Sequence, residues 1–209
     1  MVTIEEYKAD PCGVLSIPYW KSKQIIIPQS TLIVHDTEYT KDAYQQYHDE
    51  PYFRLYHSLE NIQAMSLQDI SIVSVRKEDI PLIADVINRS YTDLSVTVEQ
   101  LNGYTKTDVF CPELWIAAVD NASGRTVGCG IADLDKDLRE GIIEWVQVIP
   151  SYRGRKIGRL IVNELLRRMV HIAEFATVSG KANSVTLPEM LYRKCGFTGN
   201  DVWHILTKQ

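Results

Sequence analysis

Basic side chains and glycines gather in residues 146–159, VQVIPSYRGRKIGR, where a predicted strand gives way to a predicted helix. The first turn of a helix leaves backbone N–H groups unpaired, and these groups carry partial positive charge. Glycine allows an anion to approach the backbone closely. The segment supplies four cations and two glycines: Arg153, Gly154, Arg155, Lys156, Gly158 and Arg159. We therefore predict a binding site for a diphosphate group at this turn.

Two familiar phosphate-binding motifs do not describe this segment. It lacks the GxxxxGK[ST] pattern of a P-loop and the GxGxxG pattern of a dinucleotide-binding loop. The net charge of the chain is -5, which argues against a nucleic-acid binder and favours a small anionic ligand. An ordinary strand-to-helix turn with a solvated basic start remains the alternative.

The elements that position this turn are clearest after residue 71. Hydrophobic periodicity and turn residues predict the order β-α-α-β-β-β-α-β-α-β. The ranges are 72–76, 80–90, 96–104, 114–119, 126–134, 142–148, 157–173, 175–178, 187–194 and 202–207. Three consecutive strands argue against a doubly wound fold, so we predict a mixed α/β fold with a mostly antiparallel, twisted sheet flanked by helices. Gly128 and Gly130 inside a strand indicate a bulge or a close backbone contact.

Residues 1–66 form a smaller N-terminal region that is rich in tyrosine and carries no chemical motif. Short strands are predicted at 25–27, 31–35 and 52–59. We place the boundary with the 71–209 domain at 67–71.

The composition describes an ordinary soluble protein of 209 residues. No apolar run reaches the ~20 residues of a membrane span, and the first residues do not resemble a secretory signal. Four scattered cysteines form no CxxC pair, which indicates reduced thiols, and the five histidines show no metal-ligand spacing. We expect a cytoplasmic protein with no metal, no nucleic-acid partner and no membrane partner.

The segment VQVIPSYRGRKIGRLIVNELL resembles the central motif of the GNAT N-acetyltransferases, [Q/R]-x-x-G-x-[G/A]. Arg153 matches the first position and Gly158 the last. Lys156 stands where the family has glycine, and we expect it to adopt a helical first-turn backbone, since its Cβ disfavours the left-handed region. The resemblance covers about residues 71–209.

The resemblance implies acetyl-CoA as co-substrate, with its diphosphate at the helix start and its pantetheine arm beside strand 142–148. The cofactor-binding residues it implies are Val146, Gln147, Val148, Arg153, Gly154, Arg155, Lys156, Ile157, Gly158 and Arg159. Backbone N–H groups near Val146 would stabilise the developing oxyanion.

A second element, LYRKCGF at 191–197, resembles the LYxKxGF element of the same family. Gly196 is explained as a left-handed helix cap, with Phe197 folding back on the core. By the resemblance, Tyr192 protonates the departing thiolate; a ring buried for packing is the alternative. Many family members have an asparagine seven residues before this tyrosine, where the chain has Val185. Asn183 is therefore the candidate for the cofactor-binding asparagine.

Glu144 is the candidate general base, because amine acetylation requires a neutral nucleophile and a proton acceptor. It lies within the apolar run IIEWV, and similar enzymes often carry glutamate at this position. A solvent-facing glutamate is the alternative, and Asp133 and Asp135 are weaker candidates. No covalent intermediate is required, so we interpret Cys129 and Cys195 as structural.

The sequence therefore predicts transfer of an acetyl group from acetyl-CoA to a primary amine of an unidentified small-molecule or peptide acceptor. Residues 1–66 are a possible wall of the acceptor site, and core packing or a dimer face are the alternatives. A homodimer is possible. An acyl-CoA-binding sensor without turnover and an interaction module without a ligand remain the alternatives.

Overall fold

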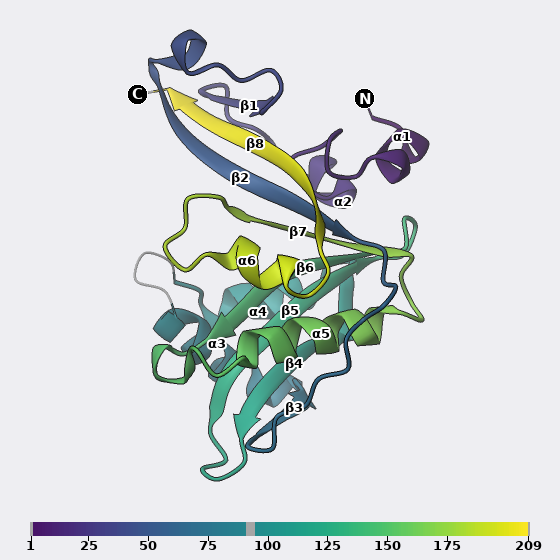
Figure 1. Cartoon of the computed structure of the whole chain (residues 1–209), viewed down its shortest axis with the longest axis vertical. Helices are drawn as coiled ribbons and strands as arrows, with labels where there is room; N and C mark the ends of the chain where they lie inside the picture. Colours follow the sequence, from purple (N-terminus) through teal and green to yellow (C-terminus); the bar gives the residue numbers. More distant parts are fainter. Residues whose placement is uncertain (1, 91–94, 209) are drawn as a thin grey trace. The chain divides into compact units, whose positions relative to one another are not determined.

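The computed structural model describes residues 2–90 and 95–208. The chain forms two compact units, one of Ser58–Ala176 and one of Met1–His57 with Thr177–Gln209. The boundary predicted at 67–71 lies inside the first of these, near its start. Mostly antiparallel strands combine with helices, which confirms the mixed α/β class (Figure 1).

The unit Ser58–Ala176 is built on an antiparallel sheet in the strand order β6-β5-β4-β3. Its strands are β3 (Ile70–Ser74), β4 (Phe110–Asp120), β5 (Thr126–Asp135) and β6 (Glu140–Val148). Its helices are α3 (Ile80–Ser90), α4 (Val98–Tyr104) and α5 (Ile157–Met169), with 3₁₀ turns η2 (Lys77–Asp79) and η3 (Pro150–Tyr152). The order of elements matches the prediction, and α3 has the predicted bounds.

The helix α5 lies against the sheet where β5 carries glycine (Figure 1). A Cβ on Gly130 would stand 2.5 Å from Cγ2 of Ile161, and a Cβ on Gly128 would stand 3.1 Å from Cδ1 of that residue. The close contact predicted for these two glycines is therefore confirmed. Large side chains of the helix fill the space that the strand leaves empty, which fixes the position of the α5 N-terminus relative to β6.

The helix α5 is shorter than the predicted range 157–173. Val170 still has helical backbone angles as the C-cap, but the chain then turns, and the N–H of Ala173 donates to the carbonyl of Met169. The apolar periodicity continues through this turn because Ala173 is buried, so periodicity alone did not reveal the end of the helix.

The second unit brings the two ends of the chain into one strand order, β1-β8-β2-β7. Its strands are β1 (Thr31–His35), β2 (Tyr47–His57), β7 (Phe175–Lys181, which begins in the other unit) and β8 (Thr198–Lys208). Its helices are α1 (Ile4–Ala9), α2 (Tyr19–Ser22) and α6 (Pro188–Arg193), with the 3₁₀ turn η1 (Lys41–Tyr44). Strand β8 pairs with both β1 and β2 in antiparallel register.

One expectation for the N-terminal region needs correction, and one helix there was missed. Residues 25–27 form no strand, because Pro28 and the turn at 29–30 separate them from β1, and Ile26 is almost fully exposed. The helix α1 was not predicted, although its signal is present: Thr3 and Glu6 form a capping box, each side chain accepting a hydrogen bond from the backbone N–H of the other.

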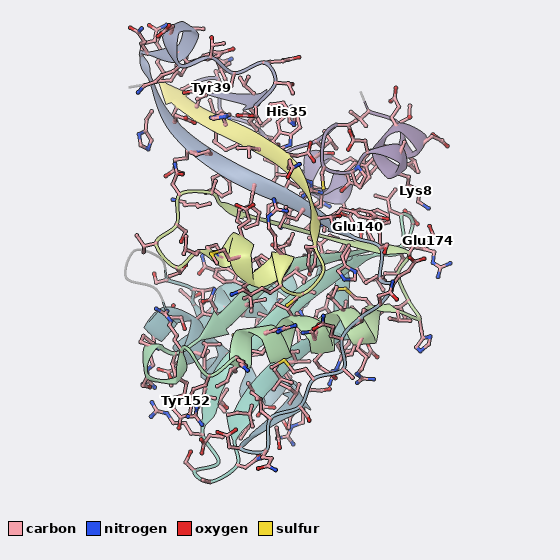
Figure 2. The ribbon with its side chains drawn as sticks, in the orientation of Figure 1. Lys8, His35, Tyr39, Glu140, Tyr152 and Glu174 are labelled. Atoms are coloured by element: carbon pink, nitrogen blue, oxygen red, sulfur yellow. The ribbon has the colours of Figure 1, made fainter. Side chains whose placement is uncertain are left out.

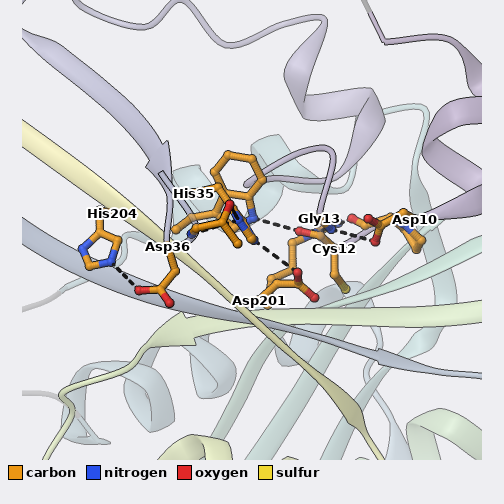
Figure 3. A network of polar contacts seen from close by, with 11 residues as sticks. Asp10, Cys12, Gly13, His35, Asp36, Asp201 and His204 are labelled. Atoms are coloured by element: carbon orange, nitrogen blue, oxygen red, sulfur yellow. Dashed lines mark hydrogen bonds and ion pairs between the residues drawn. The ribbon is translucent and has the colours of Figure 1, made fainter. Parts of the chain in front are cut away.

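Polar contacts link the strands of this second unit (Figure 3). His204 places Nδ1 2.9 Å from a carboxylate oxygen of Asp49 and Nε2 3.2 Å from one of Asp36. His35 places Nε2 3.2 Å from Asp201, so both contacts tie β8 to its neighbours. The buried guanidinium of Arg54 donates to the carbonyl of Pro11, which anchors the N-terminal segment to β2.

Candidate cofactor site

The strand β6 carries a β-bulge at Glu144. Ile143 pairs with Ala132 and Trp145 pairs with Ile131, so Glu144 is the extra residue between two consecutive pairs. Its side chain is half-buried. A bulge redirects a side chain and is common beside active sites.

Beyond the bulge, the backbone of Val146 and Val148 points away from β5. The N–H of Ile149 donates to the carbonyl of Val127, so in this part of β6 the N–H and C=O groups of odd-numbered residues bond to β5. The N–H and C=O groups of the even-numbered residues point to the opposite side of the strand. This is the orientation that the pantetheine arm would require. The carbonyl of Val148 already accepts a hydrogen bond of 3.1 Å from Nε of Arg153.

The loop between β6 and α5 contains two left-handed residues. Gly154 has a φ of 80°, and an added Cβ would meet no atom within 4 Å. Lys156 has φ 64° and ψ 10°, which corrects the expectation of a helical first-turn backbone. The loop geometry requires the conformation that the family's glycine supplies, and here a lysine is held in it at a cost of roughly 1–2 kcal/mol.

The N-terminus of α5 has the properties of an anion site. Its first helical hydrogen bond runs from the N–H of Leu160 to the carbonyl of Lys156, so the N–H groups of Ile157, Gly158 and Arg159 have no acceptor within the helix. No side chain caps this end, and the first turn carries no acidic residue. The helix dipole therefore adds its positive end to unpaired donors.

The basic side chains of the loop have different roles. The guanidinium of Arg153 also donates to the carbonyl of Ser90 at 2.7 Å, so it braces the loop against the end of α3. Arg155 pairs with Asp69, and Arg159 donates to Gln63. These contacts with residues 58–69 were not predicted, because no local pattern indicates them.

The side chain of Lys156 is exposed, and its ammonium group makes no hydrogen bond or ion pair with any residue that the structure describes. Nε of Arg159 is buried and has no hydrogen-bond partner within the described chain. A free cation and an orphaned donor beside unpaired amides fit a phosphate-bearing ligand such as acetyl-CoA. The predicted loop residues are thus brought together around one helix end.

Tyr152 is a member of this site that the sequence did not reveal (Figure 2). The guanidinium carbon of Arg155 lies 4.7 Å from the centre of its ring. Hydrogen bonds from Ser123, with a further one from Tyr152, hold the pKa of Asp120 below its usual range. Tyr152 therefore ties the loop to the β4–β5 turn.

Two predicted residues, Tyr192 and Asn183, belong to the other unit. Tyr192 lies in α6 and is buried, and its ring packs edge-on against Phe197 with centroids 5.7 Å apart. Gly196 has a φ of 98°, the left-handed cap that the sequence predicts. Asn183 is exposed in the turn that follows β7.

The cysteines offer no obvious nucleophile. All four are buried thiols that belong to no disulfide. Burial raises the pKa of the Cys129 thiol to about 12, so it stays protonated at neutral pH. Within residues 2–90 and 95–208, no three His, Cys, Asp or Glu side chains are arranged to hold a metal ion, and no helix could cross a membrane.

Residues 112–199, somewhat under half of the chain, match the family described as acetyltransferase (GNAT) domain. This part of the chain is a GNAT domain. It contains the bulge of β6, the loop with Gly154 and Lys156, and Tyr192. Compared by sequence with curated proteins, the chain has no match.

Solved structures show the same fold as the GNAT domain. A GCN5-related N-acetyltransferase from Sphaerobacter thermophilus aligns with 90% of this chain at TM-score 0.71 and 19% identity, and the chain spans 62% of that protein. The ribosomal-protein-S18-alanine N-acetyltransferase from Escherichia coli aligns with 66% of this chain and 91% of its own at TM-score 0.53 and 14% identity. A chain of the NatC complex, bound to Gag peptide and CoA, aligns with 68% of this chain and 99% of its own at TM-score 0.54 and 19% identity.

Proposed function

We propose that this protein transfers an acetyl group from acetyl-CoA to a primary amine. The observation that carries the proposal is the uncapped N-terminus of α5, which follows a bulged strand and a loop with two left-handed residues inside a GNAT domain. The NatC neighbour is a complex with CoA and a peptide, which supports a CoA ligand and an amine acceptor.

Bound acetyl-CoA would supply the thioester that makes the acetyl group reactive. The amides of residues 157–159 would bind its diphosphate, with Lys156 adding charge. Glu144, redirected by the bulge, would accept the proton of the incoming ammonium group. The phenol of Tyr192 would hold the proton that the departing sulfur needs.

Ligand-dependent melting tests the cofactor assignment. Acetyl-CoA at 100 times its dissociation constant should stabilise the protein by about 2.7 kcal/mol, while NAD and ATP should give a smaller shift. The variant Arg89→Ala, at an exposed ion pair of α3, should behave like the natural protein. No shift at millimolar acetyl-CoA would refute the proposal and favour an interaction module.

Turnover separates an enzyme from an acyl-CoA sensor. A panel of amines and peptides is screened for released CoA thiol, and Tyr192→Phe is then compared with the natural protein on any acceptor found. We expect the variant to keep its melting shift with acetyl-CoA and to lose turnover by about 100-fold. Unchanged turnover would assign Tyr192 a packing role only, beside Phe197 and Phe53.

A further inference from the structure

The strand β3 is the last in the strand order, so one of its edges has no neighbouring strand. The N–H of Val75 donates to Trp115 of β4, and the carbonyl of Asp69 accepts from Asn121. Backbone groups alternate in direction along an antiparallel strand. Ile72 and Ser74 therefore direct their N–H and C=O groups toward the open edge.

Turns close both ends of this edge. The N–H of Ile70 donates to the carbonyl of Leu67. The N–H of Arg76 donates to the carboxylate of Asp79 at 3.0 Å, and its carbonyl accepts from the N–H of Asp79. Between the two turns, Ile72 and Ser74 offer two donors and two acceptors.

Nothing in the sequence of β3 protects this edge. The strand reads ISIVS, without the charges, proline or bulge that usually prevent pairing between sheet edges. Val73 is 44% exposed and, with Leu82, Ala117 and Val119, lines an open cavity of about 320 Å³. An unpaired edge of this kind, with an exposed apolar side chain beside it, is a template for pairing with a strand of another chain.

We propose that β3 pairs antiparallel with β3 of a second copy of this chain, with Ile72 opposite Ser74 of the partner subunit. By two-fold symmetry, Ser74 then lies opposite the partner's Ile72. The two donors and two acceptors of each copy are all used in hydrogen bonds to the other copy. A shift by two residues in either direction would place Ile70 or Arg76 in a pairing position. Their N–H groups are already committed to the turns, so this register is favoured.

The symmetry axis of this arrangement passes beside Val73. Val73 faces the partner's Val73 as a non-hydrogen-bonded pair, in which the Cα atoms stand about 4.5 Å apart. The cavities that Val73 lines in the two copies meet at the same place.

Cysteine cross-linking tests both the interface and its register. All four native cysteines are buried, so a new cysteine on β3 is the accessible thiol of the described chain. Under mild oxidation, Val73→Cys should form a covalent dimer, because its Cβ atoms meet across the axis. Ser71→Cys should not, since the two copies of residue 71 lie about 13 Å apart along the strands. Cross-linking of Ser71→Cys alone, or of neither variant, would overturn the proposal.

Sedimentation equilibrium of the full chain tests the same surface without oxidation. The natural protein should dimerise, and Val73→Lys should weaken the dimer by about 10-fold or more by placing two like charges at the axis. Val170→Lys is the matched control, since Val170 is 41% exposed in the same unit but lies at the end of α5. A monomeric natural protein at tens of micromolar, or equal effects of the two lysines, would refute the pairing. A thermal melt of each variant shows that it is folded.

Discussion

Replacing Lys156 with glycine should stabilise the protein, although glycine normally weakens a folded chain. With φ at 64°, Lys156 occupies the left-handed region, which costs a residue with a Cβ roughly 1–2 kcal/mol. Glycine removes this strain but gains conformational freedom in the unfolded chain, which costs about 0.5–1 kcal/mol. The net expectation is a gain of about 0.5–1 kcal/mol in the free energy of unfolding, or about 1–4 °C in Tm.

Urea denaturation measures this difference, and two further variants isolate its cause. Lys156→Ala keeps a Cβ and hence the strain, so its stability should stay within about 0.5 kcal/mol of the natural protein. Lys194→Gly makes the same exchange at a C-cap with φ -68°, and it should destabilise by about 0.5–1 kcal/mol. If Lys156→Gly and Lys194→Gly lose stability equally, the backbone argument is wrong.

The same variants test how much the charge of Lys156, as distinct from its backbone conformation, contributes to ligand binding. Lys156→Gly and Lys156→Ala both remove an exposed cation, so each should weaken acetyl-CoA binding by about two- to five-fold. The loss should shrink at high salt, because screening reduces the contribution of a surface charge. Calorimetric titration at two salt concentrations measures it, and a salt-independent loss in both variants would contradict a role for the charge.

Three further changes test the packing, the catalysis and the electrostatics. Gly130→Ala should lower the free energy of unfolding by about 1–3 kcal/mol, because the new Cβ meets Ile161. Gly103→Ala has open space around it and should leave that free energy unchanged or raise it by up to about 1 kcal/mol. Urea titrations measure both. Glu144→Gln should lower the rate of acetyl transfer by about 100-fold with acetyl-CoA binding retained. The control Glu99→Gln, in α4, should leave the rate unchanged. Equal transfer rates for the two variants would exclude Glu144 as the base. The pKa of Glu164 is lowered by hydrogen bonds from Arg167 and Arg168, so its folded pKa lies below the unfolded one. The stabilisation by ionised Glu164 is present above the unfolded pKa and is lost as pH falls through the folded pKa. Glu164→Gln should therefore destabilise the protein near pH 7 and have no effect in acid. Urea titrations across pH measure this difference.

Local patterns in the sequence identified most of this fold. The periodicity of residues 80–90 matched α3, and turn residues between the predicted strands 114–119 and 126–134 separated β4 from β5, because both signals arise within a few neighbouring residues. The bulge at Glu144 was not predicted, since it depends on how β6 pairs with β5. A pairing register is a property of two strands, and single-strand alternation does not define it.

The loop between β6 and α5 was likewise predicted only in part. Its cations and glycines were visible in the sequence, and so was the missing family glycine at Lys156. The left-handed backbone there was not predicted, because the strain of one residue was weighed alone. The surrounding loop, held by Arg153 and Tyr152, determines the conformation instead. Partners such as Asp69 and Gln63 lie far away in sequence and leave no local signal.

The pairing of β8 with both β1 and β2 bears on how the protein is synthesised. Strands β1 and β2 leave the ribosome early, but the strand between them is nearly the last part of the chain to appear. Contacts between segments so distant in sequence form slowly, because a long loop must close first. The elements of Ser58–Ala176 are all contiguous and can associate during translation. A nascent chain that has not reached Thr198 therefore holds two strands that lack their shared partner, and unpaired strand edges of this kind favour aggregation until β8 emerges.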